Sequence, residues 1–264
     1  MRTQLWMLAG VLLLAACGEP QEPPRVELEV FADTGGIETV MTDLGYEVEL
    51  TEARLVLENL EFTIAGELHS SVLQRLSQAL IPEAHAHPGH HQDGAVTGEL
   101  RGRYIVDWTG DADPVLGKAT LLAGDYKAAN FTFERGAVTD GLPVEDPLVG
   151  HTAILRGRAS RDGEGVDFIA RLVSPVGRTV VGAPFELTVD AATNVRLGLR
   201  LLVRDPFEND TLFDGLDFSA LASAGAGPLV LEGGVEDPDR LAAYNLLRST
   251  FQSHDHFDVS IHER

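Results

Sequence analysis

The stretch YEVELTEARLVLENLEFTI, residues 46–64, alternates apolar and polar side chains along its length. Alternation with a period of two places the two sets on opposite faces of an extended chain, which is typical of half-buried strands. We therefore expect two strands here, 46–51 and 53–65. Similar runs follow along the chain: VELEVFA (26–32), YIVDW (104–108), AANFTFE (128–134), HTAILRGRAS (151–160), GVDFIARLVS (165–174), PFELTVD (184–190) and NVRLGLRLLV (194–203).

Turn sequences such as Asp162-Gly163 separate these runs, and no helices alternate with them. Many short strands joined by turns favour hairpins rather than crossover connections. The sequence therefore predicts an all-β fold, an antiparallel β-sandwich with two short helices.

The two helices are expected where the alternation stops. Ser70 can cap a first helix that Pro82 would end. Asp237 and Pro238 offer an N-cap and a first helical position for the second helix. The inner stripe of this second helix would hold Leu241, Tyr244, Leu247 and Phe251.

The N-terminus MRTQLWMLAGVLLLAAC, residues 1–17, combines one basic residue with an apolar run too short to cross a bilayer as a helix. This pattern is typical of a signal peptide. Its end, Leu14-Ala15-Ala16-Cys17, resembles the lipobox of bacterial lipoproteins. The resemblance implies that Cys17 is lipidated and anchors the chain to a lipid bilayer. Because Gly18 rather than an aspartate follows, it also implies an outer-membrane lipoprotein, with its periplasmic or surface orientation left open.

The residues after the predicted signal peptide form a short tether and one domain. Residues 18–25, GEPQEPPR, form a proline-rich tether, and residues 26–264 suffice for a single domain. Cys17 is the only cysteine, so we expect no disulfide. The formal net charge of −21 argues against a nucleic-acid partner, which would repel the chain, and suits cations.

Two clusters hold most of the chain's nine histidines. Imidazole nitrogen is a common ligand of zinc and copper, and a His-x-His pair offers two nitrogens from a short span. Four imidazoles would complete a tetrahedral zinc shell, with nearby Glu83, Asp93 or Asp255 orienting the rings. The predicted metal ligands are His85, His87, His90 and His91 in the loop PEAHAHPGHHQDG (82–94), with His254 and His256 as a second pair that projects from one side of a strand. Loose metal capture by an exposed tract and a pH sensor remain alternatives.

The acidic stretch DPFENDTLFDGLDF, residues 205–218, offers carboxylates that could suit calcium, but their spacing does not match an EF-hand loop. We expect instead a turn and a short helix with capping aspartates. The apolar residues Phe207, Leu212, Phe213, Leu216 and Phe218 would close one end of the sandwich.

Enzyme motifs are absent from the sequence: it contains no Gly-x-Ser-x-Gly, no Gly-x-x-x-x-Gly-Lys and no His-Glu-x-x-His. The sequence therefore predicts a protein that is not an enzyme. The enzyme alternative is a metal-dependent hydrolase, in which three histidines hold a zinc that lowers the pKa of bound water.

The His87-Pro88-Gly89-His90 motif, with the strand-rich segments around it, resembles bacterial envelope lipoproteins that carry a His-Pro-Gly-His loop. The layout is also similar to the β-sandwich of methanobactin-associated periplasmic copper-binding proteins. The resemblance implies an accessory lipoprotein that holds a transition metal beside an outer-membrane transporter. That group relies on tryptophans and cysteines, whereas only Trp108 remains after residue 17 here. This difference favours Zn²⁺, with Cu²⁺ as the alternative.

A function of a different class also fits the composition. The acidic domain could be a surface or assembly module that contacts another envelope protein, with histidines that bind nothing. Replacing the four loop histidines by alanine distinguishes the two hypotheses, because only metal binding predicts a loss.

Overall fold

The computed structural model describes residues 24–64, 95–110, 112–222 and 227–264. The predicted all-β fold is confirmed in this part of the chain, where twelve strands form one sheet. The strands are β1 Arg25–Ala32, β2 Val40–Met41, β3 Glu47–Ile64, β4 Ala95–Asp107, β5 Val115–Leu122, β6 Gly124–Phe133, β7 Ala153–Arg161, β8 Glu164–Leu172, β9 Thr179–Val189, β10 Val195–Leu201, β11 Leu229–Glu232 and β12 Phe257–Glu263. The helices are α2 Phe218–Leu221 and α3 Pro238–Phe251, with 3-10 turns η1 Thr34–Gly36, η2 Val138–Asp140 and η3 His254–His256.

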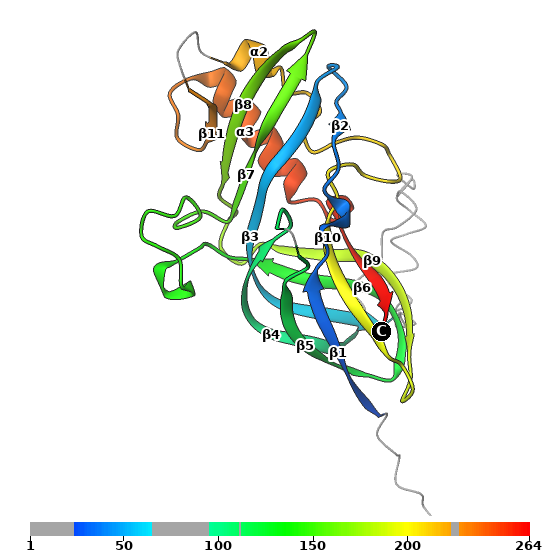
Figure 1. The fold of residues 1–264 in the computed structure, drawn as a ribbon. Helices are drawn as coiled ribbons and strands as arrows, with labels where there is room; N and C mark the ends of the chain where they lie inside the picture. The colour runs from blue at the N-terminus through cyan, green and yellow to red at the C-terminus, as the bar shows by residue number, and fades with distance from the viewer. Residues whose placement is uncertain (1–23, 65–94, 111, 223–226) are drawn as a thin grey trace, which may run out of the picture.

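Strand β3 organises the sheet because its two halves have different neighbours. Its first half pairs antiparallel with β7, and its second half pairs antiparallel with β6. β4 lies along the other side of β3 from Arg54 to Ile64. Figure 1 shows β3 running from the group formed with β7 and β8 into the curled group of β4, β5, β1, β10, β12, β9 and β6.

The prediction of two strands within residues 46–65 is wrong, because β3 is continuous. The pairing of β3 with β7 shifts between Leu50 and Glu52, which is a bulge and not a turn. A second shift follows Glu58, beside Asn59 with φ 53°. Bulges bend a strand and increase its twist, so they allow one strand to serve both groups.

The sheet is also mixed rather than purely antiparallel, which corrects the predicted antiparallel sandwich. β1 runs parallel to β10, with Glu29 opposite Arg196, and β11 runs parallel to β8. Figure 1 shows this mixed sheet curled into a half-barrel. A period-two pattern places side chains on faces but does not specify the partner or direction of a strand, which explains the error.

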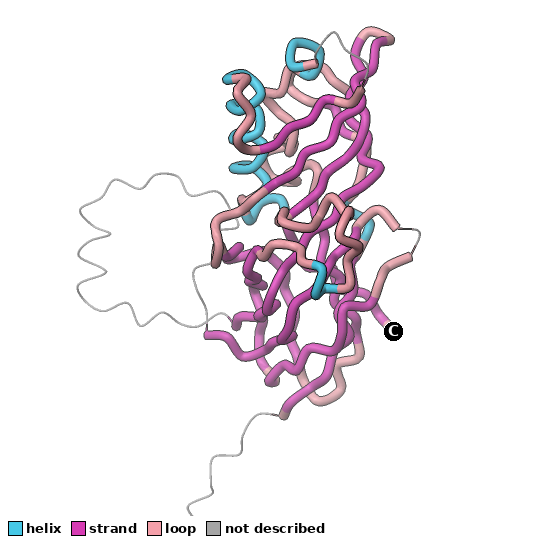
Figure 2. The backbone as a smooth tube through the Cα atoms, turned by 90° about the vertical axis from the view of Figure 1, so that its left-hand side faces the viewer, coloured by secondary structure: helices cyan, strands magenta, loops and turns pink. Residues whose placement is uncertain are grey.

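The second predicted helix is confirmed as α3. Asp237 is its N-cap and accepts from the amides of Asp239 and Arg240, and Pro238 occupies the first turn. Tyr244, Leu247 and Phe251 are buried against the sheet. Figure 2 shows α2 and α3 at the same end of the molecule, and α3 packs on β8 and β11. The helix expected between Ser70 and Pro82 lies outside the described residues.

Aromatic side chains fill the centre of the fold. Trp108 is 1% exposed, and its Nε1 donates to the Leu199 carbonyl at 2.8 Å, so the indole is buried with its polar group satisfied. Phe131, Phe251 and Phe257 pack edge to face within the same core. No helix in the described part of the chain is long and apolar enough to cross a membrane.

Candidate metal centre

The chain leaves β10 and doubles back in a narrow hairpin formed by residues 203–212. The Asp205 amide donates to the Asp210 carbonyl at 2.9 Å, and the Leu212 amide donates to the Val203 carbonyl at 3.0 Å. Asn209 adopts a left-handed conformation with φ 63°, which asparagine tolerates better than most residues. The hairpin brings Asp205 and Asp210 opposite each other.

Three carboxylates gather at this turn. One oxygen from each of Asp205, Glu208 and Asp210 lies within 4.8 Å of the others. Asp205 is 2% exposed, and its Oδ1 accepts from the Phe207 amide at 2.8 Å. This is the group found among the described residues with enough close carboxylate, thiolate or imidazole donors for a metal ion.

Asp210 is the unusual member of the group. Its Oδ1 is buried and has no hydrogen-bond partner in the described part of the chain. Burial raises the pKa of this carboxyl, the nearby carboxylates of Asp205, Glu208 and Asp214 raise it further, and His256 opposes them. A buried carboxylate oxygen without a partner is costly, and a cation would remove that cost.

His256 lies beside this hairpin and not on a strand. It ends the 3-10 turn η3, and β12 begins at the next residue. The His256 Nδ1 lies 2.9 Å from the Leu202 carbonyl oxygen, which can only accept, so Nδ1 carries the hydrogen. His254 lies in the same turn with its Nε2 3.1 Å from Asp255. The expectation that both rings project from one side of a strand is therefore wrong.

The remaining predicted ligands are not placed by the structure. His85, His87, His90 and His91, like Glu83, Asp93 and Cys17, lie outside the described residues. Their roles stay predictions.

The expectation of capping aspartates in the acidic stretch is partly confirmed. Asp217 is the N-cap of α2, where it accepts from the Ala220 amide, and its pKa falls to about 2 because the Tyr46 hydroxyl donates to it at 2.6 Å. Phe207, however, is 57% exposed and does not close an end of the fold. The other four apolar residues expected there, Leu212, Phe213, Leu216 and Phe218, are buried.

The sequence analysis weighed the carboxylates of this stretch as calcium ligands and set them aside, and it did not single out Asp205. The signal available was a pair of aspartates on either side of a turn that contains Asn209. The sequence alone does not show that the carboxylates of Asp205 and Asp210 lie close together. Their proximity depends on the hairpin, which the hydrogen bond between the Leu212 amide and the Val203 carbonyl stabilises.

Two other polar features are weaker candidates for a functional site. Asp33 Oδ2 lies 3.0 Å from His262 Nε2 and also accepts from Ser260. In a catalytic triad the histidine bridges serine and aspartate through its two different nitrogens. Here one carboxylate oxygen contacts both partners, so these three residues do not form a triad.

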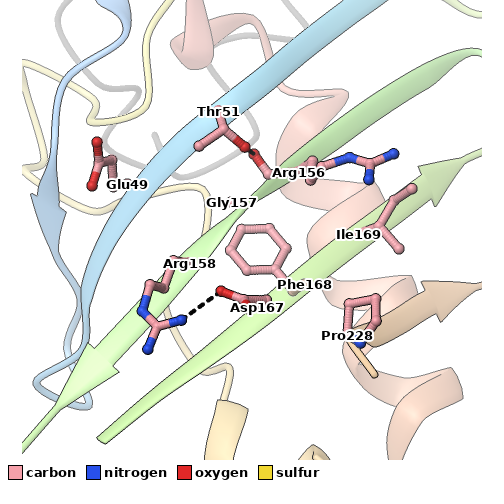
Figure 3. Close-up of a pocket in the computed structure, with 9 residues that line it drawn as sticks. All are labelled: Glu49, Thr51, Arg156, Gly157, Arg158, Asp167, Phe168, Ile169 and Pro228. Carbon is pink, nitrogen blue, oxygen red and sulfur yellow. Dashed lines mark hydrogen bonds and ion pairs between the residues drawn. The ribbon is translucent and has the colours of Figure 1, made fainter. Parts of the chain in front are cut away.

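A hollow of about 380 Å³ lies on the outer face of β3, β7 and β8. Arg158 donates to Asp167 at 2.7 Å, and Arg156 donates to Glu52 at 2.9 Å. The two guanidinium groups point away from each other in Figure 3. They do not converge on a ligand position, so the carboxylate group remains the better candidate.

No family model matches the chain, and no curated protein matches it. Among solved structures it is similar to MbnP from Methylosinus trichosporium, at 14% sequence identity, over 91% of this chain and 99% of that chain, with a TM-score of 0.34. A similarity of this degree establishes neither a common fold nor a common function.

Proposed function

We propose that this chain is a lipid-anchored envelope protein that binds a divalent metal ion, with one binding position at the carboxylates of Asp205, Glu208 and Asp210. The buried, unpartnered Oδ1 of Asp210 carries the proposal. Desolvation of a carboxylate costs several kcal/mol, on the order of 1–3 kcal/mol for the missing hydrogen bond alone, unless a partner compensates. A divalent cation supplies that partner and neutralises the repulsion among three close carboxylates.

The donor chemistry leaves a small choice of metals. Carboxylate oxygens alone suit calcium, magnesium or manganese, whereas a set that also includes imidazole suits zinc. We favour Zn²⁺, with Cu²⁺ as the alternative, because the proposed ligands include both donor types. The imidazoles are His85, His87, His90 and His91 of the loop and His254 and His256 of the turn.

The biological role that fits these features is metal acquisition or handling, beside an outer-membrane transporter, with Cys17 as the membrane anchor. The strongly acidic chain supports it, since a net charge of −21 attracts cations to the surface. Catalysis is not part of the proposal.

Zinc titration by isothermal calorimetry tests this function. The protein is the chain without its predicted signal peptide and without a histidine tag. One variant carries Asp205→Asn and Asp210→Asn, and a second carries alanine at the four loop histidines. The matched control carries Asp162→Asn and Glu236→Gln, which remove two exposed carboxylates outside the hairpin.

We expect the hairpin variant to lose one zinc or to weaken it by about tenfold or more, a free-energy change of about 1.4 kcal/mol. The control should bind as the unmodified chain does. Zinc binding that survives in the hairpin variant but disappears with the loop histidines would place the metal at the loop and contradict the hairpin site. No binding of zinc, copper, manganese or calcium would contradict the function itself and favour an assembly module.

A further inference from the structure

The chain between β6 and β7, residues 134–152, is a long loop that projects from the body of the fold (Figure 1). Apart from the 3-10 turn η2 and an isolated bridge, it has no regular secondary structure. Loops longer than about 12–15 residues of this kind are uncommon in compact domains and often have a binding role. Its base is fixed, because Leu148 is buried against Ile154 and Ile169 on the outer face of the sheet.

The tip of this loop presents an apolar side chain and a carboxylate to solvent. Val144 is 76% exposed, and its neighbours Pro143 and Glu145 are exposed as well. The Glu145 carboxylate has no hydrogen bond or ion pair within the part of the chain that the structure describes. A single exposed valine is ordinary, but this one adjoins an unpaired charge at the end of a loop with a fixed base. The tip therefore offers a partner two kinds of contact.

The hollow on the outer face of β3, β7 and β8 has the complementary chemistry. Ile169 and Pro228 line it with apolar surface, and Arg156 lies directly opposite Ile169 in the pairing of β7 with β8. The Arg156 Nε donates to Glu52, which leaves Nη1 and Nη2 without a hydrogen-bond partner among the described residues. Figure 3 shows this guanidinium on the Ile169 side of the hollow, away from Arg158. A valine followed by a glutamate can contact both the apolar surface and the free nitrogens.

The loop and the hollow are neighbours on one face of the molecule. Ile169 belongs to both, because it packs against Leu148 of the loop and also lines the hollow. Two copies related by a twofold axis can therefore exchange their loop tips, so that each tip enters the hollow of the other copy. Such an interface is isologous, and every contact in it occurs twice.

The charge on this face also allows two copies to approach each other. With a formal net charge of −21, most surfaces of two copies repel each other. The arginines on the outer face of β3, β7 and β8 are paired with carboxylates: Arg54 with Glu52 and Asp146, Arg156 with Glu52, Arg158 with Asp167, and Arg171 with Glu232. This local balance of charge reduces the repulsion where the loop and the hollow lie.

We propose that this face is the interface of a homodimer, in which the loop tip Pro143-Val144-Glu145 of one copy occupies the hollow of the other. Val144 packs on Ile169 and Pro228, and the Glu145 carboxylate binds the free nitrogens of Arg156. A loop needs only one of the two arginines in the hollow, so their divergence does not oppose this contact. The inference is independent of the proposed metal binding, which uses other residues.

Sedimentation velocity over a range of protein concentrations tests the dimer, with the chain that lacks its predicted signal peptide. Val144→Asp and Glu145→Arg change the exposed tip and leave the buried base of the loop intact. Arg156→Glu reverses the charge in the hollow. Val115→Asp is the matched control, because this valine is 56% exposed and lies on β5, outside the proposed interface.

We expect each of the three interface variants to weaken the dimer by about tenfold or more, and the control to leave it unchanged. In a homodimer of Glu145→Arg or of Arg156→Glu, like charges meet at both contacts. In an equimolar mixture of the two variants, opposite charges meet at both contacts, so the mixture should recover the dimer. Dimers unaffected by both tip variants would overturn the inference, as would a mixture without recovery. So would a chain that stays monomeric up to about 1 mM.

A milder variant keeps the test decisive if Arg156→Glu does not fold beside Glu52. Arg156→Gln removes the charge without reversing it and should weaken the dimer by about threefold or more. The dimer of the unmodified chain should also weaken as sodium chloride is added, because salt screens the contact between Glu145 and Arg156. A dimer unchanged by Arg156→Gln and by salt would contradict the proposed contact.

Discussion

Asp205 and Asp210 face each other across the hairpin that follows β10. The amide of Asp205 donates to the carbonyl of Asp210 at 2.9 Å, and an oxygen of each carboxylate falls within the same 4.8 Å group as Glu208. The backbone bond therefore stabilises a geometry in which the side-chain charges repel each other. Such an arrangement is less stable alone than with a cation, which makes the site testable through stability as well as through binding.

Asp210→Asn should stabilise the metal-free protein and reduce its stabilisation by zinc. The substitution removes the charge of a partly buried carboxylate next to two other carboxylates, so we expect a gain of about 1 kcal/mol without metal. At a zinc concentration a hundred times the Kd, the unmodified chain should gain about 2.7 kcal/mol, or on the order of 5–10 °C in Tm. Thermal unfolding with and without zinc measures both effects. Equal zinc shifts in the two proteins would count against the site.

The hydrogen bond from Tyr46 to Asp217 should make stability depend on pH. The folded pKa of Asp217 is about 2, below the ordinary value of 3.8, so its contribution is present above pH 4 and is lost as the pH falls towards 2. Tyr46→Phe should therefore cost about 1 kcal/mol at pH 7 and less at pH 2.5, with the carboxylate's partial exposure limiting the size. Urea unfolding at both pH values measures the difference.

Tyr104→Phe is the control for this pH effect. The Tyr104 hydroxyl donates to the Arg101 carbonyl at 2.7 Å, and a carbonyl does not titrate. Its cost should be the same at both pH values. If Tyr46→Phe also costs the same at pH 7 and pH 2.5, the depressed pKa of Asp217 does not depend on Tyr46.

The ion pair between Arg54 and Asp146 should be a main attachment of the loop between β6 and β7. Two hydrogen bonds of 3.0 and 3.1 Å join the side chains, and the pKa of Asp146 falls below its usual range because of Arg54. A double-mutant cycle with Arg54→Gln and Asp146→Asn should give a coupling of about 2 kcal/mol. The exposed pair Arg158 and Asp167 should couple by less than about 0.5 kcal/mol. Equal couplings would contradict this ranking.

Gly157→Ala should destabilise the fold because β3 passes too close for a side chain. A Cβ at Gly157 would lie 2.2 Å from the Glu49 carbonyl oxygen, so the strands must separate, at a cost of about 1–3 kcal/mol. Gly110→Ala is the control, since its nearest atom outside the adjacent residues is 3.8 Å away. Chemical denaturation should rank the two variants clearly. Equal stabilities would show that β3 and β7 are not in this register.

Local patterns in the sequence predicted the local structure well. The period-two alternation predicted the all-β fold, and Asp237 with Pro238 predicted the start of α3. In each case the structure depends on a few adjacent residues: alternating residues define the faces of a strand, and a capping residue starts a helix. The prediction of a break between two strands failed at Glu52. The polar residues there form a bulge and not a turn, and this is visible only in how β3 pairs with β7.

Long-range relationships were not predictable from the same patterns. The parallel pairing of Glu29 with Arg196 joins segments far apart in the chain, and alternation does not specify such partners. The carboxylate group has the same origin, because it depends on how Asn209 turns the chain. His256 was named as a ligand because it forms a His-x-His pair with His254, whereas in the structure His256 contacts Leu202 and His254 contacts Asp255.

Anomalous X-ray diffraction at the zinc absorption edge, from crystals of the zinc-loaded chain, tests the central claim most directly. We predict a peak about 2.0–2.2 Å from carboxylate oxygens of Asp205 and Asp210, in the hairpin that follows β10. A fully loaded crystal with zinc only at other positions, or with no zinc at all, would contradict the account.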